Sequence, residues 1–302
     1  MRYREDQRKK SVALRDKLFR DPGGGVFKKT PREFVLEDPV LNLWADIRQE
    51  ALDYFERNRI VWWGDQGNQP SGHLLSSQIA CLNHLFFLRQ REDIATTVLQ
   101  KIYPEIVSAI QVDDGFVEFE VVGCQNYLGE KSHTRGANAT SIDAVMVGKK
   151  SNGKNLFVMI EWKYTEDYQK DNKYIPARAQ IYDRLLAEQD CPIKVDNFES
   201  LYYEPFYQLM RQTLLGWKIV QNGEYGCDEY IHLHVIPAAN KELKDRVTSP
   251  GLDGDSMSAA WKNVLAQPAH YRPISPEEFL SPGRQCKDTA SIFTYLESRY
   301  WN

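Results

Sequence analysis

The sequence lacks several features that would assign it to a class at once. Among its 302 residues, no run approaches the ~18 consecutive apolar residues that a membrane-spanning helix needs. The first ten residues, MRYREDQRKK, have no apolar segment behind their charges, so we expect no secretory signal and a cytoplasmic protein. The five cysteines are widely spaced and form no C-x-x-C pair, which argues against a disulfide framework or a zinc knuckle.

Motifs of several common enzyme classes are absent as well. There is no nucleophile elbow (G-x-S-x-G), no Rossmann glycine fingerprint and no H-E-x-x-H zinc motif. The glycines within 21–32 (DPGGGVFKKTPR) are not followed by Gly-Lys-Ser/Thr, so they form no phosphate loop, and we expect no nucleotide cofactor. With two prolines beside them, these glycines indicate a loop or linker. Internal repeats are absent too, and the length allows one large α/β domain or two smaller ones.

Charge is distributed unevenly along the chain. The net charge is −4, but residues 1–32 contain eleven Lys or Arg and four Asp or Glu, which leaves −11 for the rest. We interpret residues 1–32 as a basic N-terminal arm and linker, and 33–302 as one domain. A solvated, partly disordered arm explains the basic segment equally well. Proteins that bind nucleic acid over their whole surface are usually basic, so a polyanion would have to meet a local basic patch or a metal among carboxylates.

Hydrophobic periodicity predicts the order of the secondary-structure elements. Helical spacing marks seven segments: 41–57, 74–90, 92–110, 176–189, 203–217, 258–266 and 287–299. Runs of β-branched and aromatic residues bounded by turn signals mark four strands: 116–123, 140–148, 155–164 and 229–237. This order predicts an α/β architecture in which helices flank a central sheet.

The second and third predicted strands contain the most informative charges. Between them, an Asn-Gly pair favours a hairpin turn. A three-residue loop Ser151–Gly153, with its glycine in the left-handed conformation, would place Asp143 directly opposite Glu161. Lys163 lies two residues further on and shares that face. A strict two-residue Asn-Gly turn would shift the pairing by one and put the two acids on opposite faces.

Three charged groups on one face of apolar strands are costly to bury, and two facing carboxylates repel. A divalent cation would remove that penalty. Mg²⁺ is typically held by one or two carboxylates while it keeps several waters, and it can bind a phosphate. Lys163 beside such a cation could orient an attacking water and offset phosphate charge. A structural salt-bridge cluster of Asp143, Glu161 and Lys163 is the alternative explanation.

An Asp in the first strand of a hairpin, followed by a hydrophobic strand that ends in Glu-x-Lys, resembles the PD-(D/E)XK nuclease superfamily. SIDAVMV (141–147) is similar to the first half of that motif and IEWKY (160–164) to the second half. Ile142 stands where the motif name has proline, a turn feature that binds no metal. Three further segments resemble bacterial restriction-endonuclease-like proteins: WWGDQGNQPSGHLLSSQIACLNHLFF, RGANATSIDAVM and the Tyr/Gln-rich helix near 203–216.

This resemblance covers about 74–237 and implies a restriction-endonuclease-like core, with a central mixed four-stranded sheet and 238–302 as a C-terminal extension. It implies Asp143, Glu161 and the Trp162 carbonyl as ligands of Mg²⁺ or Mn²⁺, and Lys163 as the catalytic lysine. DNA is the implied partner, and the implied reaction is hydrolysis of a phosphodiester bond by an activated water. Cutting both strands of a duplex with one such site calls for two copies or two events, so a homodimer is one expected state. RNA as substrate, or a catalytically silent module that binds nucleic acid or protein, remains open.

Other polar residues are candidates for contacts with substrate or metal. Glu120 could add a carboxylate to the metal site, although one of Glu118 and Glu120 could simply face solvent. Six residues are candidates for substrate binding: Gln78, Asn83, Gln208, Arg211, Lys170 and Lys173. Helix packing or capping explains the first two equally well, and a plain solvated loop explains the two lysines. His232 and His234 share a strand face, but without a third ligand they make a weak zinc site.

Overall fold

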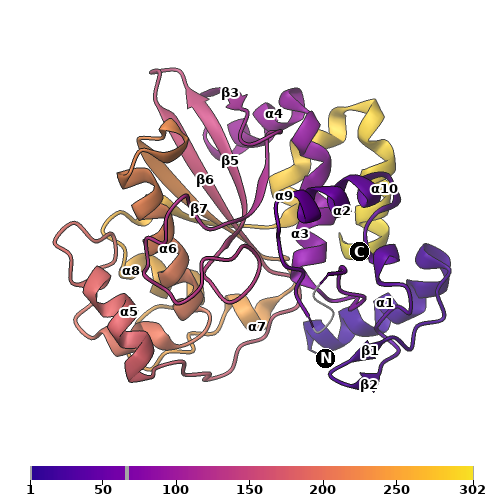
Figure 1. Cartoon of the computed structure of the whole chain (residues 1–302), viewed down its shortest axis with the longest axis horizontal. Helices are drawn as coiled ribbons and strands as arrows, with labels where there is room; N and C mark the ends of the chain where they lie inside the picture. The colour runs from indigo at the N-terminus through magenta and orange to yellow at the C-terminus, as the bar shows by residue number, and fades with distance from the viewer. Residues whose placement is uncertain (1, 65–67, 302) are drawn as a thin grey trace.

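The computed structural model describes residues 2–64 and 68–301, and a mixed β-sheet runs through its centre (Figure 1). The sheet has six strands: β3 (Ile106–Ile110), β4 (Glu118–Val121), β5 (Ile142–Lys150), β6 (Asn155–Trp162), β7 (Glu229–Val235) and β8 (Tyr271–Ile274). Their order is β3-β5-β6-β7-β8, with β4 also paired to β5. The pairs among β3, β4, β5 and β6 are antiparallel, whereas β6, β7 and β8 run parallel. The predicted α/β class with a mixed sheet is confirmed, but the expected count of four strands is wrong.

Two strands of the sheet were missed by the periodicity. The segment 92–110, predicted as one helix, divides into a helix and then β3, where Ile106 and Ala109 are buried and Val107 is exposed. The strand has only five residues, and its buried positions 106 and 109 are three apart, so its sequence continues the helical spacing of the preceding segment. The other strand, β8, contains Pro273, and a proline argues for an edge strand, which is where β8 lies. The sheet therefore extends beyond the core limit expected at residue 237.

Helices cover both faces of the sheet. Ten are present in the described part of the chain: α1 (Tyr3–Phe19), α2 (Arg48–Arg57), α3 (Ser77–Leu85), α4 (Glu92–Ile102), α5 (Pro176–Leu186), α6 (Phe206–Gln221), α7 (Lys241–Lys244), α8 (Met257–Asn263), α9 (Pro276–Leu280) and α10 (Ala290–Leu296). Buried side chains of α2, α3, α4, α9 and α10 form one core, and those of α5, α6 and α8 form another (Figure 1). Alternate residues of β5 and β6 face each core, for example Met146 and Val158 on one side and Val147 and Phe157 on the other.

The basic N-terminal segment is not a disordered arm. Residues Tyr3 to Phe19 form α1, and Tyr3, Gln7 and Phe19 are buried against the rest of the protein. The Tyr164 hydroxyl donates a hydrogen bond to Gln7 Oε1 at 3.0 Å. A short hairpin of β1 (Val26–Phe27) and β2 (Thr30–Pro31) follows α1. Residues 2–31 therefore form a fixed part of the structure, and α1 contacts Tyr164 just past the end of β6.

The β5–β6 hairpin has the predicted three-residue loop. Strand pairs run from Lys149–Asn155 to Ala144–Ile160. Gly153 has a φ of 85°, and its N–H donates to the Lys150 carbonyl at 2.9 Å. The left-handed conformation is one that glycine adopts without steric cost. Continuing this register by one pair places Asp143 opposite Glu161, as the sequence predicted.

Helix α6 approaches the sheet closely because residue 216 is a glycine. A Cβ atom at Gly216 would lie 2.0 Å from the Sδ atom of Met159 on β6, and both residues are buried. This contact sets how near the polar side chains of α6 come to the end of β6.

We expect Gly216→Ala to lower the free energy of unfolding by about 1–3 kcal/mol, because overpacking a core costs this much. Alanine gains only about 1 kcal/mol over glycine in helix propensity, so the steric term should dominate. Urea denaturation would measure the change. In a Met159→Ala background, the same substitution should become neutral or stabilising, and an equal loss in both backgrounds would contradict the packing argument.

Candidate functional site

A cleft of about 460 Å³ lies where β5 begins and β6 ends. Asp143 is the second residue of β5 and Glu161 the second-to-last residue of β6, so the antiparallel hairpin brings both to one end of the sheet. Glu120 of β4 and Lys163, just past β6, line the same cleft. Residues from α1, the β1–β2 hairpin, α3 and α6 complete its walls. The structure therefore brings together the three residues that the motif predicted as catalytic.

The floor of this cleft is recessed. Glu161 is 1% exposed and Lys163 is 4% exposed, whereas Asp143 is half-buried. The Trp162 N–H donates to Asp143 Oδ2 at 2.7 Å, which holds that carboxylate against the end of β6. The two strand ends thus fix the position of Asp143 through the backbone as well as through the register.

An ion pair joins Glu161 to Lys163 at the floor. Lys163 Nζ lies 2.5 Å from Glu161 Oε1, and it also donates to Gln208 Oε1 and to the Tyr168 hydroxyl, at 2.5 and 3.3 Å. Gln212 donates to Glu161 Oε2 and to the Ser141 carbonyl. Of the salt-bridge cluster that was the alternative explanation for these charges, the Glu161–Lys163 pair is therefore present, whereas Asp143 accepts from the Trp162 N–H. The pair is part of the cleft, so it does not by itself exclude a catalytic role.

Helix α6 supplies the side chains that position this ion pair. Gln208 was a predicted candidate, and the structure places it on the ammonium group of Lys163. The sequence interpretation missed Gln212, which holds Glu161. Both glutamines lie on one face of α6 because they are four residues apart, and that spacing is the signal that could have found Gln212.

Glu120 is the third carboxylate of the cleft. Gln78 Nε2 and the Ser141 hydroxyl donate to its two oxygens, each at 2.7 Å. Glu120 has a φ of 53°, a left-handed conformation that is uncommon and strained for a residue with a side chain. The predicted roles of Gln78 and Glu120 as cleft residues agree with this placement. Glu118, by contrast, contacts Arg135 and the Tyr225 hydroxyl outside the cleft.

The electrostatics of the cleft favour bound protons when no cation is present. Burial, followed by the charges of Glu161 and Glu120, raises the pKa of Asp143 well above its usual value. Burial also raises the pKa of Glu120, and the charge of Glu161 adds to this effect. Burial alone would lower the pKa of Lys163, but the charge of Glu161 and smaller contributions from other acidic groups outweigh it and raise that pKa. Asp143 and Glu120 are therefore costly to ionise without a compensating cation.

These residues fit a hard cation that keeps part of its water shell. Across residues 2–64 and 68–301, no three His, Cys, Asp or Glu side chains form a ready-made metal cluster. Two carboxylates and a backbone carbonyl are nevertheless sufficient for Mg²⁺, which retains several waters. Glu161 Oε1 is buried and contacts the Lys163 ammonium group at 2.5 Å, so a cation bound here would share this carboxylate with Lys163. The donor set contains only oxygen, which disfavours zinc.

Four predicted substrate-binding residues lie outside the cleft. Asn83 is buried, and it donates to the Asn42 carbonyl at 3.0 Å and to the Tyr300 hydroxyl at 2.9 Å. It therefore joins the N-terminal and C-terminal segments and does not line the cleft. Arg211 donates to Thr140 Oγ1 at 3.0 Å. On the loop after β6, Lys170 is exposed, and Lys173 pairs with Asp171 at 2.6 Å.

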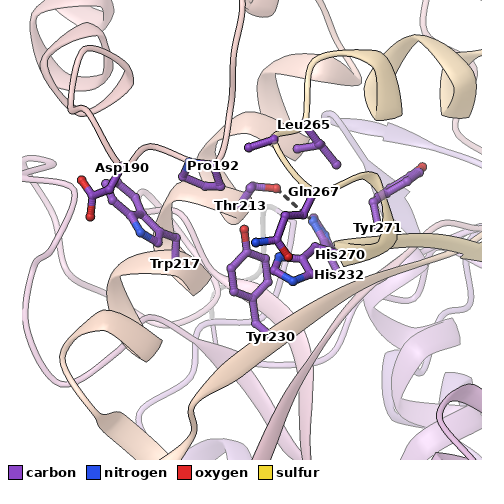
Figure 2. Close-up of a pocket in the computed structure, with 11 residues that line it drawn as sticks. Asp190, Pro192, Thr213, Trp217, Tyr230, His232, Leu265, Gln267, His270 and Tyr271 are labelled. Atoms are coloured by element: carbon purple, nitrogen blue, oxygen red, sulfur yellow. Dashed lines mark hydrogen bonds between the residues drawn. The ribbon is translucent and has the colours of Figure 1, made fainter.

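The two histidines of β7 take part in separate hydrogen bonds. His234 Nδ1 lies 2.9 Å from the Tyr271 hydroxyl, and His232 Nδ1 lies 3.2 Å from Thr213 Oγ1. Burial, together with the charge of Lys163, lowers the pKa of His232 to about 3. Figure 2 shows His232 in a second cavity, of about 220 Å³, with Tyr230 and other residues around it. Among residues 2–64 and 68–301, neither histidine belongs to a group of three potential metal-binding side chains.

One protein-family model matches nearly the whole chain. The model of the REase-ARP family, described as restriction endonuclease associating with ARP, matches residues 4–301. The chain belongs to this family. No curated protein and no solved structure matches it. Membership of REase-ARP supports the predicted restriction-endonuclease-like class, and it implies DNA as a partner. The match includes α1 and the segment after residue 237. The assignment to the PD-(D/E)XK superfamily stays a prediction.

In the described ranges 2–64 and 68–301, no helix is long and apolar enough to cross a membrane.

We expect the metal-free protein to lose stability as the pH rises above the ordinary carboxyl range. Asp143 has a higher pKa in the folded than in the unfolded state, so the native protein binds more protons and its stability falls with rising pH. Asp143→Asn keeps an oxygen acceptor for the Trp162 N–H but removes the charge.

This variant should therefore be more stable than wild type at pH 8 in EDTA, by more than the ~0.5 kcal/mol scatter of surface substitutions. The gain should shrink towards pH 4, where the carboxyl group is protonated in the native state and about half protonated in the unfolded state. Urea denaturation across this pH range, with the exposed Asp196→Asn as control, would measure the effect. A gain that does not change with pH would contradict this account of the carboxylates.

Proposed function

We propose that this REase-ARP protein is a divalent-metal-dependent nuclease that hydrolyses phosphodiester bonds in DNA, with a site of the PD-(D/E)XK type. The observation that carries the proposal is the convergence of Asp143, Glu161 and Lys163 at the paired ends of β5 and β6. Membership of a restriction-endonuclease family supports the same reaction class.

Asp143, Glu161 and the Trp162 carbonyl would hold Mg²⁺ or Mn²⁺, and Glu120 could contribute through a water. When bound, the cation would neutralise phosphate charge and lower the pKa of a bound water. The cost of ionising Asp143 and Glu120 supports this assignment, because a cation would offset it. No covalent enzyme intermediate is needed.

Lys163 would place a fixed positive charge beside the reacting phosphate. Glu161, Gln208 and Tyr168 hold its ammonium group at the cleft floor, so little reorganisation is needed when substrate binds. Preorganised donors of this kind stabilise charge that develops in the transition state. Lys163 would accordingly orient the attacking water and stabilise the more negative pentavalent phosphate.

A catalytically silent module that binds nucleic acid or protein is the second candidate. The Glu161–Lys163 ion pair favours it, because the pair neutralises both charges without any metal. A metal-dependent thermal shift that is lost in Glu161→Ala would argue for the metal site. A homodimer stays a prediction.

A plasmid assay tests the proposed reaction. We expect wild type to nick or linearise plasmid DNA in Mg²⁺ or Mn²⁺ and to be inactive in EDTA. Glu161→Ala and Lys163→Ala should each lose at least ~100-fold in rate, because each removes a group that contacts the reacting phosphate or its metal.

The exposed residues Glu199 and Lys149 provide matched controls, since Glu199→Ala and Lys149→Ala should cleave like wild type. Cleavage that persists in Glu161→Ala, or no cleavage of either plasmid or single-stranded DNA by wild type under any metal condition, would reject this proposal for the site.

DNA binding should depend on the basic side chains that α1 adds to the cleft. Arg4 is exposed and lines the cleft wall. Its positive charge can attract a polyanion locally, although the protein has a net charge of −4. We expect Arg4→Ala to reduce the slope of log K against log[salt] by about 0.7–0.9, the value for one phosphate contact.

Filter binding or fluorescence anisotropy across a salt series would measure this slope, with Lys149→Ala as control. The single substitution is sharper than deletion of residues 1–32, which would also remove the packing of Tyr3 and Phe19. Equal slopes for Arg4→Ala and wild type would show that α1 does not contact the phosphates.

A further inference from the structure

Three aromatic side chains form a cluster on the rim of the carboxylate cleft. Trp63, Phe27 and His73 all line this cleft. The Phe27 ring centroid lies 6.1 Å from that of Trp63 and 4.8 Å from that of His73. Trp63 is 50% exposed, and the other tryptophans are half-buried or buried. A large exposed ring beside a polar cleft indicates a contact surface for a ligand.

Hydrogen bonds connect this aromatic cluster to the cleft floor. The backbone N–H of Trp63 donates to Gln78 Oε1 at 2.9 Å, and Gln78 Nε2 donates to Glu120 Oε1 at 2.7 Å. A ligand stacked on Trp63 would consequently lie at a defined separation from the carboxylates. Burial, followed by nearby positive charges, lowers the pKa of His73 to about 4, so this ring of the cluster is neutral.

The positive charge beside the cluster suits a phosphate backbone. Lys28 lines the cleft, and with Lys29 it forms the tip of the β1–β2 hairpin. Their φ values of 50° and 63° are left-handed, where turns of this kind usually carry Asn or Gly. Two lysines kept in a strained turn at the mouth of a site indicate that their side chains serve a function.

The depth of the cleft restricts which form of DNA can reach its floor. Glu161 and Lys163 are almost completely buried. The volume of about 460 Å³ is within the range of roughly 300–1,000 Å³ typical of pockets for one small ligand. Duplex DNA is stiff over about 150 base pairs and is too wide for such a cleft. An unpaired strand can bend, enter and present one phosphate to the floor.

We propose that the cleft binds one unpaired DNA strand, with a base stacked on Trp63 and the adjoining phosphate at Asp143, Glu161 and Lys163. The substrate class is thus single-stranded DNA, or a flap or other unpaired segment, in preference to uninterrupted duplex. Positive side chains combined with stacking aromatics are the general pattern of single-strand binding, and here Arg4 and Lys28 supply the positive charge beside the aromatic cluster. This inference rests on the proposed function, since it assigns the substrate of the same site.

Binding measured in EDTA tests the inference without requiring cleavage. The probe is a short oligonucleotide that contains 2-aminopurine, used as a single strand and as the matched duplex. We expect wild type to bind the single strand more tightly and to quench its fluorescence by stacking. Trp63→Ala should weaken single-strand binding roughly 5- to 150-fold, the loss of one stacked base, and should abolish the quenching.

Trp63→Phe keeps a flat ring and should retain most of the affinity. Val107→Ala removes a similarly exposed apolar side chain on β3, away from the cleft, and should behave like wild type. Equal affinity of wild type for single strand and duplex would overturn the inference. Unchanged single-strand binding by Trp63→Ala would overturn it as well.

The two proposals fail in different ways. Duplex cleavage that is lost in Glu161→Ala but identical in Trp63→Ala and wild type would leave the nuclease intact and overturn the strand preference. Single-strand binding that depends on Trp63, without metal-dependent cleavage of any DNA, would support strand binding and reject the nuclease.

Discussion

The buried contact between the Glu161 carboxylate and the Lys163 ammonium is the interaction on which the cleft depends. Two nearly buried charges are stable only when their remaining polar groups are also satisfied. Helix α6 meets part of this requirement, because Gln208 contacts Lys163 and Gln212 contacts Glu161. These contacts require α6 to lie close to β6, and Gly216 permits that approach. Gly216, four residues after Gln212 on α6, therefore affects the geometry of the ion pair between Glu161 and Lys163.

Other features of the cleft also lower the stability of the folded protein. Asp143 and Glu120 resist ionisation, Glu120 has a strained backbone, and the turn at Lys28 and Lys29 is left-handed at both residues. Such features persist only where the surrounding structure enforces them, and they concentrate at functional sites. A purely structural salt bridge would explain the ion pair but not the additional carboxylate and the strained turn. Their coincidence in one cleft is what favours catalysis over a stabilising role.

The parts that could be predicted from sequence are those set by local geometry. The turn at Gly153 determines the register of β5 and β6, so the position of Asp143 relative to Glu161 followed from the turn type alone. Long-range packing was not predictable in this way. Asn83 and Gln78 are both polar residues in an apolar helix. Asn83 donates a hydrogen bond to the C-terminal Tyr300, whereas Gln78 donates one to Glu120 in the cleft. Only the positions of distant segments separate these two outcomes.

Helix α1 shows how a segment with little hydrophobic pattern becomes part of a site. Its buried residues are few, but Gln7 accepts a hydrogen bond from Tyr164, the residue that follows Lys163. The Tyr3 N–H donates to Glu242 Oε1 at 3.2 Å, just beyond the last strand predicted from sequence, 229–237. Contacts to two separate segments hold α1 as a wall of the cleft, and Arg4 of α1 adds a positive charge to that wall. An acidic chain can bind a polyanion in this arrangement, because the attraction depends on the few charges that surround the site and not on the net charge.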